Sequence, residues 1–155
     1  MNMSSRKPYL DKISPDTFKP FLALSANVTS EAIAAGLTPE ETELIKVRAS
    51  QINACAYCLN VHTADARKIG VSGQKLDLLA AWREATIFSE RERAIIAVAE
   101  TATRTPLTAE SHRELDAAQE VLGDEQFAYA QWLAVTINAF NRISILSEYP
   151  VRERK

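Results

Sequence analysis

The residues of this chain that are best suited to chemistry are its two cysteines, Cys55 and Cys58, together with His62. They stand at positions i, i+3 and i+7, which on an α-helix places the three side chains within ~60° of one another. If the pair lies at a helix N-terminus, unpaired backbone N–H groups and the helix dipole stabilise a thiolate and lower its pKa. Two thiols this close in the chain can also cycle between dithiol and disulfide. The spacing therefore predicts redox chemistry at this pair.

Thiol redox chemistry also needs a group that moves protons. A thiolate that attacks a peroxide becomes a sulfenic acid, which condenses with a neighbouring thiol and releases water. His62 follows Cys58 by one helical turn, and imidazole titrates in the required range. Glu43 lies one predicted helix earlier and would face His62 if the two helices pack antiparallel. Tyr57, between the cysteines, is a candidate phenolic donor at the pocket mouth, with packing as its alternative role.

A C-x-x-C motif also occurs in zinc sites and in c-type haem proteins. The motif is half of a tetrahedral zinc site, and a Cys2His2 set would need both His62 and His112, or Glu43 in place of one. A helical module with a structural zinc therefore stays open as an alternative. A c-type haem requires His directly after the second cysteine, where this chain has Leu59, so that site is excluded. We expect neither a cofactor nor a resident metal.

Helix signals recur along the whole chain, whereas no alternating apolar run is long enough to predict a strand. Thr38 with Glu41, and Ser89 with Glu92, have the spacing of capping boxes. These signals predict an all-α fold of six or seven helices, which excludes a thioredoxin-like fold. The predicted helices are bounded by Ser14 and Gly36, Thr38 and Asn53, Ala54 and Gly70, Ser72 and Trp82, Ser89 and Pro106, Thr108 and Gly123, and Asp124 and Pro150.

Length and composition narrow the class of protein. The 155 residues fit one domain, which we place at residues 14–150, between an N-terminal tail (1–13) and a C-terminal tail (151–155). The net charge is −2 and no basic block occurs, so nucleic acid is not an expected partner. No apolar stretch approaches the ~18 residues of a membrane span, and the polar N-terminus lacks the hydrophobic run of a signal peptide. We expect a cytoplasmic protein that binds no membrane.

The stretch from Glu43 through Cys55-Ala-Tyr-Cys58 to His62 resembles the signature of the AhpD-like alkylhydroperoxidases, which belong to the carboxymuconolactone decarboxylase superfamily. The likeness extends through residues 62–70, 79–84 and 88–94. It implies an all-helical AhpD-like fold that assembles as a homo-oligomer, commonly a trimer or hexamer. It also implies that Cys58 becomes the sulfenic acid, that Cys55 is the proton donor and resolving thiol, and that Glu43 and His62 form the proton relay.

The resemblance and the residues together predict a peroxidase, that is, a thiol-dependent (alkyl)hydroperoxide reductase with an antioxidant role. The implied reductant is a thiol, such as a lipoylated protein or a peroxiredoxin. The best-known members carry a second His between the cysteines, where this chain has Tyr57. The decarboxylase branch does not use a C-x-x-C pair, so the pair favours redox chemistry. The alternatives are a disulfide reductase that relays electrons to a partner protein, a decarboxylase of the carboxymuconolactone type, and the zinc module.

Overall fold

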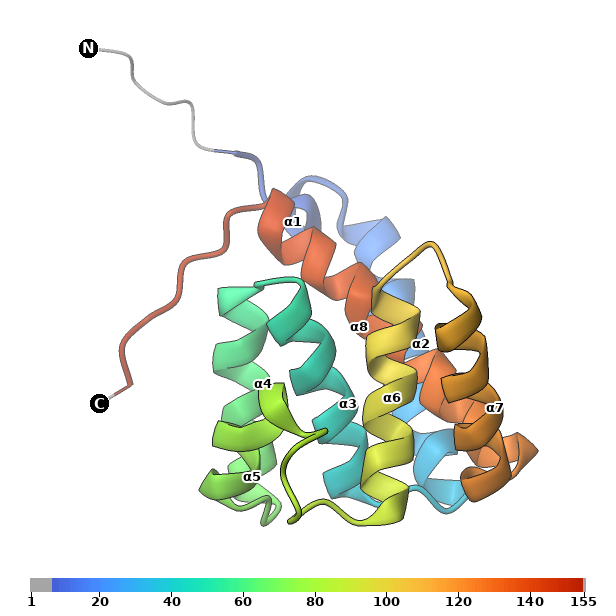
Figure 1. Ribbon diagram of the computed structural model, residues 1–155. Helices are drawn as coiled ribbons and strands as arrows, with labels where there is room; N and C mark the ends of the chain where they lie inside the picture. The colour runs from blue at the N-terminus through green and yellow to red at the C-terminus, as the bar shows by residue number, and fades with distance from the viewer. Residues whose placement is uncertain (1–6, 155) are drawn as a thin grey trace.

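The computed structural model describes residues 7–154, and within that range every regular element is helical (Figure 1). The predicted all-α class is therefore confirmed. The helix predicted as far as Trp82 ends at Leu78 and continues as a 3₁₀ turn. In chain order the elements are α1 (Leu10–Ile13), α2 (Pro15–Ala34), α3 (Pro39–Ile52), α4 (Ala56–Lys68), α5 (Gly73–Leu78), the 3₁₀-helix η1 (Leu79–Ala81), α6 (Glu90–Thr103), α7 (Ala109–Leu122) and α8 (Asp124–Leu146).

Among residues 7–154, helix α1 brings the number of α-helices to eight, where six or seven were predicted. Its single turn falls in the segment that was predicted to be a tail. It is stabilised from the far end of the chain, because the Leu10 N–H donates to Ser147 Oγ (3.1 Å) and the Tyr149 hydroxyl donates to Asp11. A four-residue turn has no hydrophobic period of its own and depends on such long-range contacts. The predicted count of six or seven did not include this turn.

The predicted capping boxes begin α3 and α6. The Glu41 N–H donates to Thr38 Oγ1 (3.1 Å) and the Thr38 N–H donates to Glu41 Oε2 (2.9 Å); Ser89 and Glu92 repeat the arrangement. Helix α2 begins at Pro15 as predicted, but the Ser14 side chain makes no capping hydrogen bond. Ser14 is also the last residue of the α1 turn, and its N–H donates to the Leu10 carbonyl. This double role gives Ser14 a backbone conformation that differs from an ordinary N-cap.

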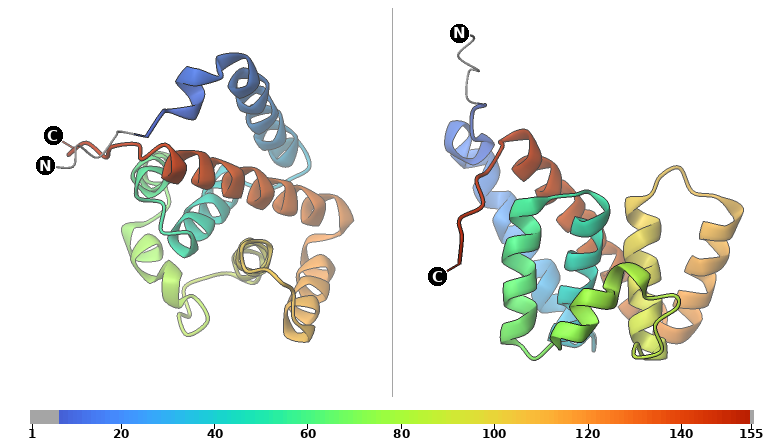
Figure 2. Two further views of the ribbon diagram at one scale, coloured as in Figure 1. Left: turned by 90° about the horizontal axis from the view of Figure 1, so that it is seen from above. Right: turned by 60° about the vertical axis from the view of Figure 1, so that its left-hand side comes forward.

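The core lies where α3, α6 and α8 pack against one another. Helices α4 and α7 flank the α3–α6 pair in Figure 1, and Figure 2 shows α8 lying between that pair and α2. Trp82 and Phe88 are buried in this core, whereas Trp132 on α8 is half exposed. No helix within residues 7–154 combines the length and apolar character needed to cross a membrane.

The buried carboxylate of Glu100, on α6, is bonded to side chains of α3 and of the segment that precedes α6. Glu100 is 2% exposed and accepts hydrogen bonds from Arg48 Nε (2.7 Å), from the Trp82 indole N–H (3.0 Å) and from Arg83. Burial alone would raise the pKa of Glu100, but these donors outweigh it and hold the pKa below the usual value. A buried charge with several donors fixes the helices around it, and it was not anticipated from the sequence.

Candidate functional site

The turn between α3 and α4 places Cys55 directly in front of a helix. Helix α3 ends at Ile52, and Ala54 adopts the left-handed conformation (φ 52°). The Cys55 N–H then donates to the Ser50 carbonyl (3.0 Å) and the Ala54 N–H to the Gln51 carbonyl (3.2 Å). This pair of bonds is a Schellman motif, which usually has Gly where this chain has Ala54. The predicted break near residues 53–54 is confirmed.

Buried amides attach this turn to α8. Asn53 Nδ2 donates to Asn138 Oδ1 and to Asn141 Oδ1, both at 2.8 Å. Asn141, fully buried, donates in turn to Ser50 Oγ (3.0 Å). Asn141 and Ser50 are buried, Asn53 and Asn138 are partly buried, and each has a partner, so the network holds the turn in one position. The sequence analysis did not identify these residues, and two Asn in the otherwise apolar stretch of α8 were the available signal.

The two cysteines form a disulfide at the N-terminus of α4. Cys55 is the N-cap, and its sulfur accepts a hydrogen bond from the backbone N–H of Cys58, with N and S 3.4 Å apart. Both residues are buried, at 1% and 3% exposure. In the reduced protein, the same unpaired N–H groups and the helix dipole would favour a thiolate here.

Glu43 and His62 meet between α3 and α4. His62 Nδ1 lies 2.9 Å from Glu43 Oε2, while Lys46 Nζ donates to Glu43 Oε1 at 2.8 Å. Burial acts to raise the pKa of Glu43, but the hydrogen bond from His62 and the charge of Lys46 prevail and lower it. Glu43 is therefore a carboxylate at neutral pH, and it orients the imidazole so that Nδ1 carries the proton. The sequence analysis anticipated the approach of Glu43 to His62 and missed Lys46.

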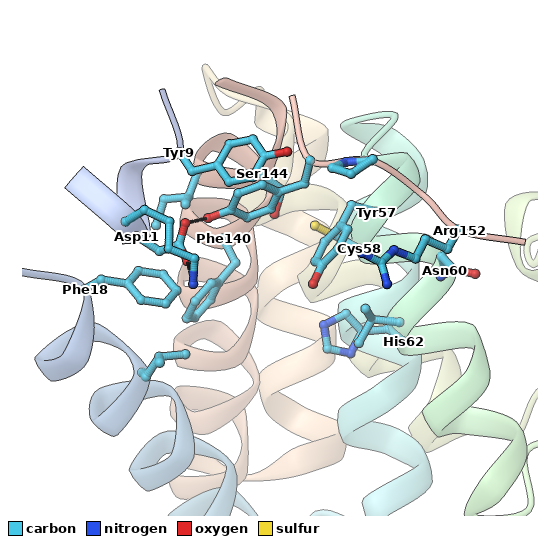
Figure 3. Close-up of a pocket in the computed structure, with 16 residues that line it drawn as sticks. Tyr9, Asp11, Phe18, Tyr57, Cys58, Asn60, His62, Phe140, Ser144 and Arg152 are labelled. Carbon is cyan, nitrogen blue, oxygen red and sulfur yellow. Dashed lines mark hydrogen bonds and ion pairs between the residues drawn. The ribbon is translucent and has the colours of Figure 1, made fainter. Parts of the chain in front are cut away.

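A cavity of about 800 Å³ opens against one side of this group (Figure 3). Cys58 and His62 line it, one helical turn apart on α4, whereas Cys55 and Glu43 lie behind them. Tyr57 also lines the cavity, is 39% exposed, and meets the ring of Tyr149 edge-on at 5.1 Å. A molecule in the cavity therefore lies beside Cys58, which is itself 3% exposed, and beside the imidazole.

The zinc alternative finds little support in this geometry. Among residues 7–154, the group with ligand atoms close enough for a metal is Glu43, His62 and Asp65, whose atoms lie within 4.8 Å of one another. It contains neither cysteine, and Lys46 already binds Glu43. His112, which a Cys2His2 site would need, is exposed on α7.

Two known proteins resemble this chain over more than nine tenths of its length, and a third resembles about half of it. It is 33% identical to the uncharacterized protein YdfG of Bacillus subtilis over 143 residues, which cover 92% of this chain and 94% of YdfG. It is 32% identical over 72 residues to the uncharacterized protein YnjA of Escherichia coli, covering 46% of this chain and 40% of YnjA. A crystal structure of an Agrobacterium tumefaciens protein of unknown function, described as a candidate AhpD antioxidant defence protein, matches with a TM-score of 0.80 and 31% identity. That match covers 96% of this chain and 100% of the other.

The model of the carboxymuconolactone decarboxylase family matches residues 15–101. The matched stretch begins with α2, ends within α6 and contains Glu43, both cysteines and His62. The chain therefore belongs to the carboxymuconolactone decarboxylase family, as one of its AhpD-like members.

Proposed function

We propose that this protein is a thiol peroxidase that reduces hydroperoxides through a dithiol/disulfide cycle of Cys55 and Cys58. The observation that carries the proposal is the placement of the two sulfurs. Cys58 lines an open cavity beside His62, whereas its disulfide partner Cys55 is buried behind it at the N-cap of α4. In this arrangement the sulfur of Cys58 would react with the substrate, and the sulfur of Cys55 would react only with the sulfur of Cys58. This asymmetry matches a peroxidatic and a resolving cysteine.

In the first step the Cys58 thiolate attacks the O–O bond of the hydroperoxide. An S–O bond forms and the O–O bond breaks, so Cys58 is oxidised to a sulfenic acid and the peroxide is reduced to an alkoxide. Imidazolium at His62 gives its Nε2 proton to the alkoxide, which leaves as an alcohol. Glu43, bonded to Nδ1, balances the positive charge of the imidazolium before the transfer.

In the second step the Cys55 thiol gives its proton to His62 and its sulfur attacks the sulfur of Cys58. The S–S bond forms, the S–O bond breaks, and hydroxide takes the proton from His62 and leaves as water. The sum of both steps converts two thiols and one hydroperoxide into a disulfide, an alcohol and water. A dithiol reductant then restores both thiols by exchange through a mixed disulfide.

The implied reductant, a lipoylated protein or a peroxiredoxin, belongs to this proposal, and so does assembly as a homo-oligomer. The antioxidant description of the Agrobacterium structure agrees with the peroxidase assignment. Half-exposed apolar side chains on α8, among them Trp132 (51%) and Val135 (54%), offer a surface that a second copy could cover.

Single-turnover stopped-flow kinetics of the reduced protein test the proposal. Wild-type protein should consume one equivalent of hydroperoxide, and Cys58→Ser should consume none. Cys55→Ser should consume one equivalent and hold a sulfenic acid on Cys58 that dimedone labels, as seen by intact-protein mass spectrometry. Consumption that survives Cys58→Ser would contradict the proposal. If no hydroperoxide reacts but Cys55→Ser traps a partner protein in a mixed disulfide, the disulfide reductase alternative replaces it.

A further inference from the structure

The cavity beside Cys58 is formed by parts of the chain that are far apart in sequence. Besides α4, it is lined by α1, α2, α8 and residues 149–152 of the C-terminal segment. Much of its wall is apolar or aromatic, with Phe18 and Leu22 from α2 and Phe140 and Ile143 from α8 (Figure 3). A wall of this kind suits the hydrocarbon part of a ligand.

The charges at the cavity do not cancel. Asp11 pairs with Lys12 (3.1 Å) and accepts a hydrogen bond from the Tyr149 hydroxyl. The bond from Tyr149 lowers the pKa of Asp11, and burial together with Asp11 raises the pKa of Tyr149 to about 12. At neutral pH Asp11 is therefore a carboxylate with two hydrogen-bonding partners, Lys12 carries a positive charge, and Tyr149 is a neutral phenol. Arg152, which also lines the cavity, makes no hydrogen bond or ion pair with any residue in the range 7–154 and leaves the lining with an excess positive charge.

The residue two positions after Arg152 attaches this end of the chain to α4. Arg154 Nε donates to Asn60 Oδ1 (3.0 Å), and its terminal nitrogen donates to the Asn60 carbonyl and to Thr63 Oγ1 (3.2 Å). These bonds join the side chain of Arg154 to α4, the helix that carries Cys58 and His62. In Figure 3 the Arg152 side chain reaches toward Tyr57, above His62.

We propose that the preferred substrate is an amphipathic hydroperoxide that carries a carboxylate, with its apolar chain on the α2–α8 wall, its carboxylate on Arg152 and its O–O bond at Cys58. The inference rests on the proposed peroxidase function and adds the substrate class. A guanidinium binds a carboxylate through two parallel hydrogen bonds, which gives orientation as well as attraction. Because Arg152 is exposed to solvent, the expected preference over an uncharged analogue is roughly 10-fold in rate constant, and it should weaken with added salt.

The test compares a C18 hydroperoxy fatty acid with its methyl ester, both below their micellar concentrations, in single turnovers of the reduced protein. Wild type should oxidise with the acid roughly 10-fold faster than with the ester. Arg152→Gln should slow the reaction with the acid to the rate of the ester and leave the ester rate unchanged, while Arg152→Lys should keep part of the preference. Arg113→Gln, which removes the same charge from the exposed face of α7, is the matched control and should behave as wild type.

Equal rates for the acid and the ester in wild type would overturn the inference while leaving the peroxidase function intact. If neither the acid nor the ester is reduced, the proposed peroxidase function is wrong. The preference for a carboxylate is then tested by binding alone. Calorimetry on Cys58→Ser should then show tighter binding of oleate than of methyl oleate, and the difference should vanish when Arg152→Gln is added; equal binding overturns the proposal. A third outcome would also overturn the proposal. If Arg152→Gln slows only the reduction of the disulfide by dihydrolipoate, and reduction by the uncharged dihydrolipoamide keeps its rate, Arg152 binds the carboxylate of the reductant and not that of the peroxide.

Discussion

Replacing Glu43 by Gln should slow peroxide reduction while leaving the cavity intact. Both carboxylate oxygens of Glu43 accept hydrogen bonds, one from His62 Nδ1 (2.9 Å) and the other from Lys46 Nζ (2.8 Å). A Gln side chain has the same shape but only one acceptor oxygen, so its NH2 group must face one of the two donors. The substitution therefore removes the negative charge beside the imidazole and leaves one donor without an acceptor.

The size of the effect follows from these contacts. A hydrogen bond to a charged group contributes about 1.5–3 kcal/mol, and this one is strongest when His62 is an imidazolium, the form that protonates the leaving alkoxide. Because 1.4 kcal/mol is a factor of ten in rate, we expect a loss of roughly 10- to 100-fold in the oxidation rate constant at neutral pH. Unfolding free energy should fall by about 1–2 kcal/mol, since the side chains of His62 and Glu43 are only 20% and 11% exposed.

Stopped-flow oxidation of the reduced variant between pH 5 and pH 9 measures the loss. Glu40→Gln removes the same charge from the first turn of the same helix and is the control, since Glu40 makes no contact with His62 in residues 7–154. Rates of Glu43→Gln within two-fold of wild type over this pH range, with the fold intact by circular dichroism, would refute the proton relay. An equal loss of rate in Glu43→Gln and Glu40→Gln would instead show that the rate depends on the net charge of α3 and not on the contact of Glu43 with His62.

Three further predictions concern stability and are measured by urea denaturation. Glu43 and Glu100 have pKa values in the folded protein below the ordinary value of a glutamate. The stability that they contribute is therefore complete above that ordinary value and is lost as the pH falls through their lowered pKa values; unchanged stability from pH 7 to pH 3.5 would contradict this. Ala54→Gly should raise stability by about 0.5–1 kcal/mol, because Gly adopts the left-handed conformation without strain; a decrease would show that Ala54 is unstrained. Asn141→Ala should lower the free energy of unfolding by about 2–3 kcal/mol, because Ser50 and Asn53 lose a buried hydrogen-bonding partner. A change below about 1 kcal/mol would contradict this and would show that water replaces the lost amide.

Local signals in the sequence predict most of the helices and not the contacts between them. Capping boxes and helix-ending glycines act within a few residues, so α3, α4 and α6 begin or end where Thr38, Gly70 and Ser89 predict. Helix α1 could not be predicted, because it depends on residues more than 130 positions later. For the same reason the bonds of Glu100 with Arg48 and Trp82 are not visible in the sequence. The bond of Lys46 with Glu43 is an i,i+3 pair on one helix, and that spacing was the available signal.

The prediction about Glu43 and the inference about Arg152 concern opposite kinds of position in the fold. Glu43 lies on α3, where nine of the helix's 14 residues are buried, so its contact with His62 is set by the packing of the core. Arg152 lies in a segment that is attached to α4 mainly by the side chain of Arg154. Core packing therefore sets the geometry of Glu43 and His62, while the C-terminal segment contributes Arg152 to the cavity lining. Substitutions in residues 151–154 should consequently change which hydroperoxide reacts fastest and leave the sulfur chemistry unaltered.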